Sequence, residues 1–123
     1  MTPTIRTCPS YPISIFMAGA LAKAEACCQE YCDQWPYCVT VTPTRYVYTD
    51  GNEAGFIVGL INYPRFPSSA AEIWQKAEEI ADYLVHRLGQ QSYTIQSPDR
   101  TAWFSYRGQG NPSTPTPHKE RSE

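Results

Sequence analysis

The segment from Asn62 to Ser69, with the sequence Asn-Tyr-Pro-Arg-Phe-Pro-Ser-Ser, combines side chains that could bind a small anionic ligand. It joins an expected strand to an expected helix, and the start of a helix has unpaired N–H groups that attract anions. Arg65 adds a planar fork of donors, and aromatic rings can stack on a nucleobase. The sequence therefore predicts a site for a nucleotide-like molecule at Tyr63, Arg65, Phe66, Ser68 and Ser69. A structural interpretation stays open, in which Ser69 and Glu72 satisfy the helix donors themselves.

Aromatic residues form a second group of candidates, because the chain has nine Tyr, three Trp and four Phe. Trp103 and Tyr106 are an odd number of residues apart, so a regular strand places them on opposite faces. Arg100 and Arg107 flank them, and arginine beside an exposed ring is typical of protein interfaces. An earlier strand adds two tyrosines that share one face. We therefore predict a homo-oligomer whose interface includes Tyr46, Tyr48, Trp103, Tyr106 and Arg107.

Residues for acid–base or nucleophilic catalysis are few. The two histidines are His86, in the expected second helix, and His118, near the C-terminus. The acidic cluster Glu78, Glu79 and Asp82 is typical of a solvated helix face. No phosphate-binding loop, dinucleotide-binding glycine motif or Gly-x-Ser-x-Gly motif is present. We therefore assign no catalytic residue and expect a non-enzymatic binding protein. The alternative is a small hydrolase or nucleotide-processing enzyme that uses His86 and an acidic partner.

The five cysteines are an odd number, so they cannot all pair within one chain. Four lie close together, and Cys28 and Cys32 fall on one helix face. Their spacing lacks the paired Cys-x-x-Cys pattern of zinc sites, and neither histidine lies at ligand spacing. We therefore expect reduced, packed thiols and neither a metal nor another cofactor. An oxidised pair stays an alternative, as does a zinc module built on Cys27, Cys28, Cys32 and Cys38.

Hydrophobic periodicity and turn residues predict the elements that must position these candidates. A short apolar strand, two strands joined by the turn Asp50-Gly51-Asn52, and a final hairpin alternate with two helices. The second helix begins with the capping box Ser69-x-x-Glu72 and ends at Gly89. The expected strands are 13–17, 37–49, 55–63, 93–97 and 102–107, and the expected helices are 20–35 and 69–89.

This order predicts an α+β fold, a ferredoxin-like βαββαβ sandwich with an extra C-terminal hairpin strand. One antiparallel sheet would be backed by both helices, which would bury their apolar stripes against it. Pro43 interrupts the second strand, so we expect an edge position or a bulge there. The first stripe is Leu21, Ala24, Cys28, Tyr31 and Trp35, and the second is Ile73, Ala77, Ile80, Ala81, Leu84 and Leu88.

Length and composition predict one domain with two less regular ends. The 123 residues, 41% of them hydrophobic, suffice for a single core. We expect an irregular N-terminal arm over 1–12, a domain over 13–107 and a disordered tail over 108–123. A net charge of −2 disfavours non-specific nucleic acid binding. The apolar run 13–22 loosely resembles a secretory signal but suits a buried strand better, and no run reaches the about 18 residues of a membrane span.

Three stretches resemble small uncharacterised accessory proteins of tailed bacteriophages and prophages. They are Cys38-Val-Thr-Val-Thr-Pro-Thr44, Tyr48-Thr-Asp-Gly51 and Gly59-Leu-Ile-Asn-Tyr-Pro-Arg-Phe-Pro67. The resemblance covers about residues 13–107 and brings no known catalytic residue. It implies a protein of the bacterial host cytoplasm that counters host defences, by binding either a host protein or a nucleotide-like signalling molecule.

Overall fold

The computed structural model describes residues 1–107 of the chain. It contains five strands and two helices in the order that the periodicity predicts. The strands are β1 (Ile13–Ala18), β2 (Thr40–Tyr48), β3 (Gly51–Leu60), β4 (Ser92–Gln96) and β5 (Thr101–Ser105). The helices are α1 (Leu21–Gln34) and α2 (Ala70–Arg87). The expected tail over 108–123 lies outside the described residues.

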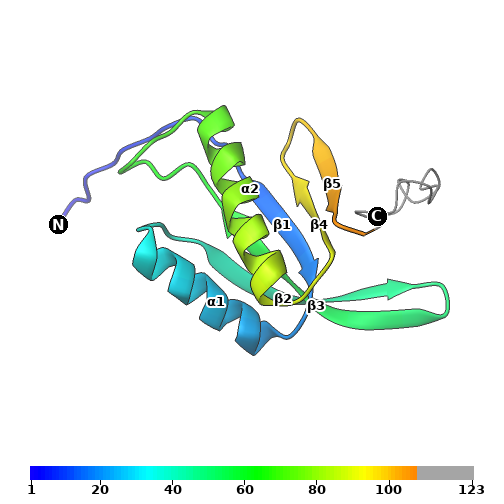
Figure 1. The fold of residues 1–123 in the computed structure, drawn as a ribbon. Coiled ribbons are helices and arrows are strands. Elements are labelled where there is room, and N and C mark those ends of the chain that lie inside the picture. The colour runs from blue at the N-terminus through cyan, green and yellow to red at the C-terminus, as the bar shows by residue number, and fades with distance from the viewer. Residues whose placement is uncertain (108–123) are drawn as a thin grey trace.

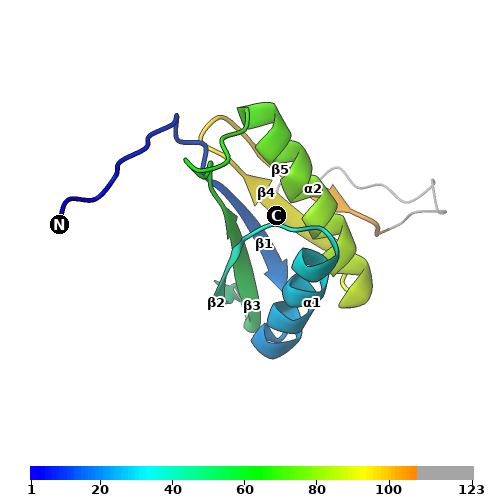
Figure 2. The same cartoon turned by 90° about the vertical axis from the view of Figure 1, so that its left-hand side faces the viewer.

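A single antiparallel sheet has the strand order β2-β3-β1-β4-β5, and both helices cover one of its faces (Figures 1 and 2). The first four strands have the order of a ferredoxin-like sandwich, and β5 extends the sheet beyond β4. The predicted α+β sandwich with an extra hairpin strand is therefore confirmed. β2 is an edge strand, which explains how the sheet accommodates Pro43.

The core lies between this sheet and the helices. Along β1, Ile13, Ile15 and Met17 are buried, and they pair across the sheet with buried residues of β3. The alternate residues face away from the helices, where no layer of residues 1–107 covers the sheet (Figure 2). One face of the sheet therefore forms the core, and the other stays open.

Helix α2 begins at the predicted capping box and buries most of its predicted apolar stripe. The Ser69 hydroxyl accepts a hydrogen bond from the Glu72 N–H at 3.1 Å, and the Glu72 carboxylate accepts one from the Ser69 N–H at 2.8 Å. Gly89, directly after the helix end, has a φ of 68°, which glycine adopts without strain. The stripe missed two buried residues, Trp74 and Val85, which widen the core-facing surface of α2.

Helix α1 follows its stripe only in part. Ala24, Cys28 and Tyr31 are buried, but Trp35 is 47% exposed and lies in extended backbone after the last helical turn. Pro36 explains this, because a proline disfavours helical geometry in the residue before it. The prediction that Trp35 belongs to the core stripe is therefore wrong. Its ring lies instead at the edge of the helical layer.

The β2–β3 hairpin is longer than the rest of the sheet, and its tip extends past both helices (Figure 1). At the base of this extension, the Tyr46 ring covers Gly55 of β3. A Cβ atom on Gly55 would lie 2.1 Å from that ring and 2.7 Å from the Met17 carbonyl oxygen. The Tyr46 hydroxyl donates to the carbonyls of Met17 and Phe56, at 3.3 and 3.2 Å. Tyr46 thus fixes the hairpin to the sheet.

The N-terminal residues 1–12 contain no helix or strand, and their first part extends away from the domain (Figures 1 and 2). Their last part is held by the buried Asn62, whose side-chain amide donates to the Pro9 carbonyl at 2.8 Å. Tyr11 packs against the core. No helix among residues 1–107 is long and apolar enough to cross a membrane.

We expect Ser69→Ala to lower the free energy of unfolding by about 1 kcal/mol, because it removes the side-chain acceptor of the capping box. Urea unfolding followed by circular dichroism measures the change. Ser68→Ala is the matched control, since only the backbone N–H of Ser68 is bonded, to the Asn62 side chain at 2.8 Å. Equal stability of the two variants would contradict a structural role for the Ser69 hydroxyl.

Candidate functional site

The loop predicted to bind a ligand is largely bonded to the protein itself. The backbone N–H groups of Ser68 and Ser69 donate to Asn62 and Glu72. The Tyr63 hydroxyl donates to the Cys38 carbonyl at 3.0 Å, and burial raises the pKa of this hydroxyl to about 12. The Arg65 guanidinium lies 5.4 Å from the centre of the exposed Phe66 ring. Several donors on which the prediction relied are therefore occupied, and ligand binding at Tyr63, Arg65, Phe66, Ser68 and Ser69 stays a prediction.

A different group of aromatic rings gathers where α1 and α2 lie side by side. Tyr31 lies 5.0 Å from Trp35 and 5.3 Å from Tyr83, measured between ring centres, and Trp35 lies 5.9 Å from Tyr83. Both contacts of Tyr83 are edge-to-face, the arrangement that the quadrupoles of aromatic rings favour. The buried Tyr31 anchors the group, and the other two rings are partly open to solvent.

The three rings and two carboxylates line a groove of about 260 Å³. Its lining residues are Tyr31, Trp35, Glu79, Asp82 and Tyr83. The faces of aromatic rings carry partial negative charge and attract cations, and carboxylates do so directly. Lys76 lies at one side, with its ammonium 3.4 Å from a Glu79 carboxylate oxygen and 3.2 Å from the Tyr31 hydroxyl. We call this set of five lining residues the helix groove, and its chemistry suits an organic cation with an apolar body.

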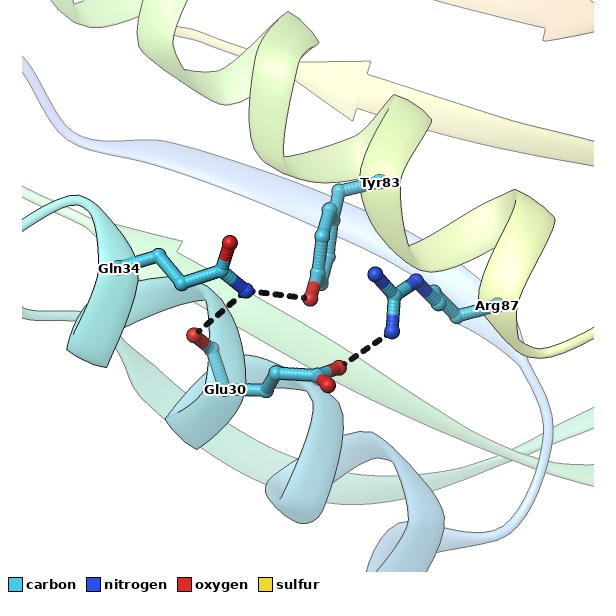
Figure 3. Close-up of polar contacts among 4 residues, drawn as sticks. All are labelled: Glu30, Gln34, Tyr83 and Arg87. Carbon is cyan, nitrogen blue, oxygen red and sulfur yellow. Dashed lines mark hydrogen bonds and ion pairs between the residues drawn. The ribbon is translucent and has the colours of Figure 1, made fainter.

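Polar contacts between the helices fix the rim of the helix groove (Figure 3). Arg87 donates to the Glu30 carboxylate at 2.7 Å, and the Gln34 amide donates to the Tyr83 hydroxyl at 3.3 Å. The Arg87 guanidinium also lies 4.4 Å from the centre of the Tyr83 ring. Interaction with the Tyr83 hydroxyl, helped by the Arg87 charge, holds the pKa of the Glu30 carboxyl below its ordinary value. These contacts hold the Tyr83 ring in place.

Asp82 links the helix groove to the one histidine of the described part of the chain. Its carboxylate accepts a short hydrogen bond from the Tyr106 hydroxyl and lies 3.2 Å from Nε2 of His86. The His86 and Tyr106 rings are 5.0 Å apart. The acidic partner expected for His86 is therefore present, and it lies one helical turn before His86 on α2.

The cysteines do not form a metal site among residues 1–107, where no three side chains of His, Cys, Asp or Glu are arranged to hold an ion. All five thiols are free. Burial raises the pKa of the Cys28 thiol to about 12, so this thiol stays protonated at neutral pH. The zinc alternative thus has no ligand set in this part of the chain.

The residues predicted to form a subunit interface fall into two groups. Tyr46 and Tyr106 bond within the same chain, to the sheet and to α2. Trp103 projects from the open face of the sheet, opposite to its neighbour Phe104, and Tyr48 and Arg107 are exposed. Trp103 and Tyr106 therefore have opposite orientations, as their odd spacing predicts. Their role in an interface stays a prediction.

Sequence reasoning missed the helix groove because its members belong to two helices that are distant in the chain. Glu79 and Asp82 were assigned to a solvated helix face, and Trp35 to the core. Tyr83 was not considered. One signal could have indicated it: Asp82 and Tyr83 lie between the buried residues Ala81 and Leu84 of α2. Residues that border a buried stripe can face a neighbouring helix.

No protein-family model and no curated protein sequence matches this chain. Its fold is similar to two solved structures of a phage SAM (S-adenosylmethionine) lyase. The lyase bound to S-methyl-5′-thioadenosine has a TM-score of 0.65 and 11% identity, covering 85% of this chain and 96% of the lyase. The lyase without ligand has a TM-score of 0.60 and 14% identity, covering 86% and 98%. At these identities, the likeness establishes a shared fold.

This likeness corrects the main functional expectation drawn from the sequence. That expectation was a non-enzymatic binding protein, whereas the solved structures of the same fold are those of an enzyme. The finding favours the alternative, a small hydrolase or nucleotide-processing enzyme. The argument from missing motifs failed because it tested only for motifs of other enzyme folds, and a small α+β sandwich can carry out chemistry without them.

We expect Tyr83→Phe and Arg87→Gln each to raise the pKa of Glu30 toward its ordinary value, because each removes a cause of the lowered pKa. A carboxyl with a lowered pKa stabilises the fold above its ordinary pKa, and this contribution is lost as the pH falls through the lowered value. NMR titration of the Glu30 side chain measures the shift. Glu72, whose pKa Ser69 lowers, is the internal control and should not move. An unchanged Glu30 titration in both variants would contradict the described contacts.

Proposed function

We propose that this protein is an enzyme that cleaves S-adenosylmethionine and releases S-methyl-5′-thioadenosine. The observation that carries the proposal is the fold shared with a phage SAM lyase along nearly the whole of that chain. The helix groove supports it independently, since its ring faces and carboxylates suit a substrate with a positively charged sulfur. The substrate is nucleotide-derived, as the sequence analysis expected of the ligand.

In this proposal the helix groove holds the sulfonium group. Trp35 is exposed and Tyr83 is partly exposed beside Arg87, and Glu79, which also pairs with Lys76, and Asp82 supply the opposite charge. Cation–ring contacts of this kind contribute roughly 0.5 to 2 kcal/mol each, more where water is excluded. The apolar rings also suit the adenosyl and methyl groups bound to the sulfur.

The proposed reaction breaks the bond between the sulfur and the side-chain carbon of the amino-acid part. The electron pair of that bond goes to sulfur, which becomes a neutral thioether in S-methyl-5′-thioadenosine. No water enters in a lyase reaction, and in a first route the fragment's own carboxylate forms the new bond to carbon and closes a five-membered ring. Both reacting groups belong to one molecule, so the protein acts by holding that molecule in a folded conformation and excluding water.

His86 supports a second route to the same thioether. If a base removes a proton from the carbon next to the breaking bond, the fragment becomes an alkene instead of a ring. His86 with Asp82 at 3.2 Å is the pair that could act as this base. NMR spectra of the fragment distinguish ring from alkene, and full turnover by His86→Ala would remove the base from the mechanism.

We expect the purified protein to convert S-adenosylmethionine into S-methyl-5′-thioadenosine, measured by liquid chromatography and mass spectrometry. In heavy-oxygen water, the amino-acid fragment should contain no solvent oxygen in samples quenched early. Incorporated solvent oxygen would indicate a hydrolase, and a folded protein that releases no thioether would contradict the proposed activity.

Variants test whether the helix groove binds the substrate. Contacts that stabilise the bound substrate and the transition state to a similar extent contribute to KM and not to kcat. We expect Trp35→Leu and Glu79→Gln to raise KM roughly two- to thirtyfold with little change in kcat. The matched control is Glu53→Gln, on the exposed β2–β3 hairpin. An active protein whose KM is unchanged in both variants would move the substrate out of the groove while leaving the proposed activity intact.

Loss of S-adenosylmethionine would deprive methyl-transfer reactions in the same compartment of their donor. The counter-defence role in the cytoplasm of an infected bacterium, which the sequence resemblance implies, belongs to this proposal. It has a different basis from the one first expected, because the molecule would be destroyed instead of captured.

Self-association also remains part of the proposal. The open face of the sheet carries the partly exposed side chains of Phe16, Ile57 and Trp103, which suit contact with a second copy of the chain. We expect native mass spectrometry to find an oligomer, and Trp103→Lys to shift it toward the monomer. Gln29→Lys, on the exposed surface of α1, is the matched control. A monomer at all concentrations would contradict this prediction without affecting the proposed reaction.

A further inference from the structure

A second cavity lies at the other end of α2 from His86. It has a volume of about 320 Å³ and is formed by three segments that are distant in the chain. These are the end of the N-terminal arm around Tyr11, the first turn of α2 with Ala71 and Trp74, and the β4–β5 turn with Ser97 and Arg100. Volumes of this order are at the small end of sites for organic ligands.

Arg100 is the one cationic side chain that lines this cavity, and its guanidinium stacks on an aromatic ring. Its guanidinium lies 3.9 Å from the centre of the Trp74 ring. Trp74 is buried, and its indole N–H donates to the Glu78 carboxylate at 2.7 Å. The turn that carries Arg100 is also bonded internally, since the Ser97 hydroxyl accepts from the N–H groups of Asp99 and Arg100 at 3.2 Å. Ring and turn together orient the guanidinium.

Arg100 is an exposed residue that lines the cavity. Within residues 1–107, no carboxylate lies within ion-pair distance of its guanidinium, and the contact of this group is the stack on Trp74. Stacking uses the face of a guanidinium and leaves its N–H edges free, and these edges match the two oxygens of a carboxylate or phosphate. The remaining walls are largely apolar, with Tyr11, Ile13 and Ala71 among them, and Asp99 is the one acidic residue of the lining.

We propose that this cavity is a binding site for a small molecule with an oxyanion group on an apolar body, and that Arg100 binds the oxyanion through its N–H edges. The site is separate from the helix groove, because no residue lines both and their nearest lining residues on α2, Trp74 and Glu79, are roughly 7.5 Å apart along the helix at about 1.5 Å per residue. The two sites also differ in charge: the helix groove suits a cation, and this cavity suits an anion.

Benzoate, benzamide and inorganic phosphate are probes that test separately whether binding requires the oxyanion group and whether it requires the apolar body. Trp74 reports binding by its fluorescence in the double variant Trp35→Phe, Trp103→Phe, which leaves it as the chain's one tryptophan. We expect benzoate to change this emission saturably, and benzamide, which has the same ring without the charge, to have no such effect. Phosphate should bind at least several-fold more weakly than benzoate, because it lacks the apolar body. Equal responses to benzoate and benzamide would overturn the proposal, and phosphate binding as tight as benzoate would overturn the role of the apolar walls.

Variants assign the binding to Arg100. We expect Arg100→Gln to weaken benzoate binding by roughly tenfold or more, and Arg100→Lys by less, since lysine keeps the charge but loses the fork. Arg45→Gln, on the β2–β3 hairpin, is the matched control and should bind as the parent does. S-Methyl-5′-thioadenosine, which has no anionic group, should not displace benzoate. Unchanged affinity in Arg100→Gln would overturn the assignment, and thermal melting of each variant shows that it is folded.

Discussion

The packing of α2 on the central strands is the interaction on which the rest of the molecule depends. Its stripe from Ile73 to Val85 is almost completely buried, and it lies against the core residues of β1 and β4. Burial of a large aliphatic side chain contributes roughly 1.5 to 3 kcal/mol, so rotating this helix would be costly. Because the rotation of α2 about its own axis is fixed in this way, the directions of its remaining side chains are fixed as well. Tyr83 and Glu79 face α1, and Trp74 faces the β4–β5 turn.

Features that depend on residues close together in the chain could be predicted from the sequence, and features that depend on contacts between distant segments could not. Elements that depend on neighbouring residues were predicted well, namely the capping box at Ser69, the glycine after α2 and the short apolar strand that begins at Ile13. Trp35 was wrongly assigned to the core because the apolar periodicity of α1 continues to Trp35. The helix itself ends at Gln34, since Pro36 disfavours helical geometry in the residue before it. The helix groove and the Arg100 cavity were missed because each joins residues from separate elements, and periodicity says nothing about which helix faces meet.

The two candidate sites lie on one helix but differ in what makes them selective. In the helix groove, acidic groups and ring faces act together on a cation, and the Glu30–Arg87 pair holds the rim. At the other end, a guanidinium stacked on Trp74 offers its free edges to an anion. Two of the largest aromatic residues, Trp35 and Trp74, therefore lie beside charged groups in the two candidate sites.

The close fit of Tyr46 over Gly55 has a consequence for finding relatives of this protein. No side chain can replace the Gly55 hydrogen while the Tyr46 ring stays where it is, so the two positions can change only together. At 11% to 14% identity to the solved structures, overall similarity carries little information. A tyrosine followed nine residues later by a glycine, placed diagonally across a hairpin in which Tyr46 pairs with Glu53 and Gly55 with Thr44, is instead a local feature by which to search for relatives.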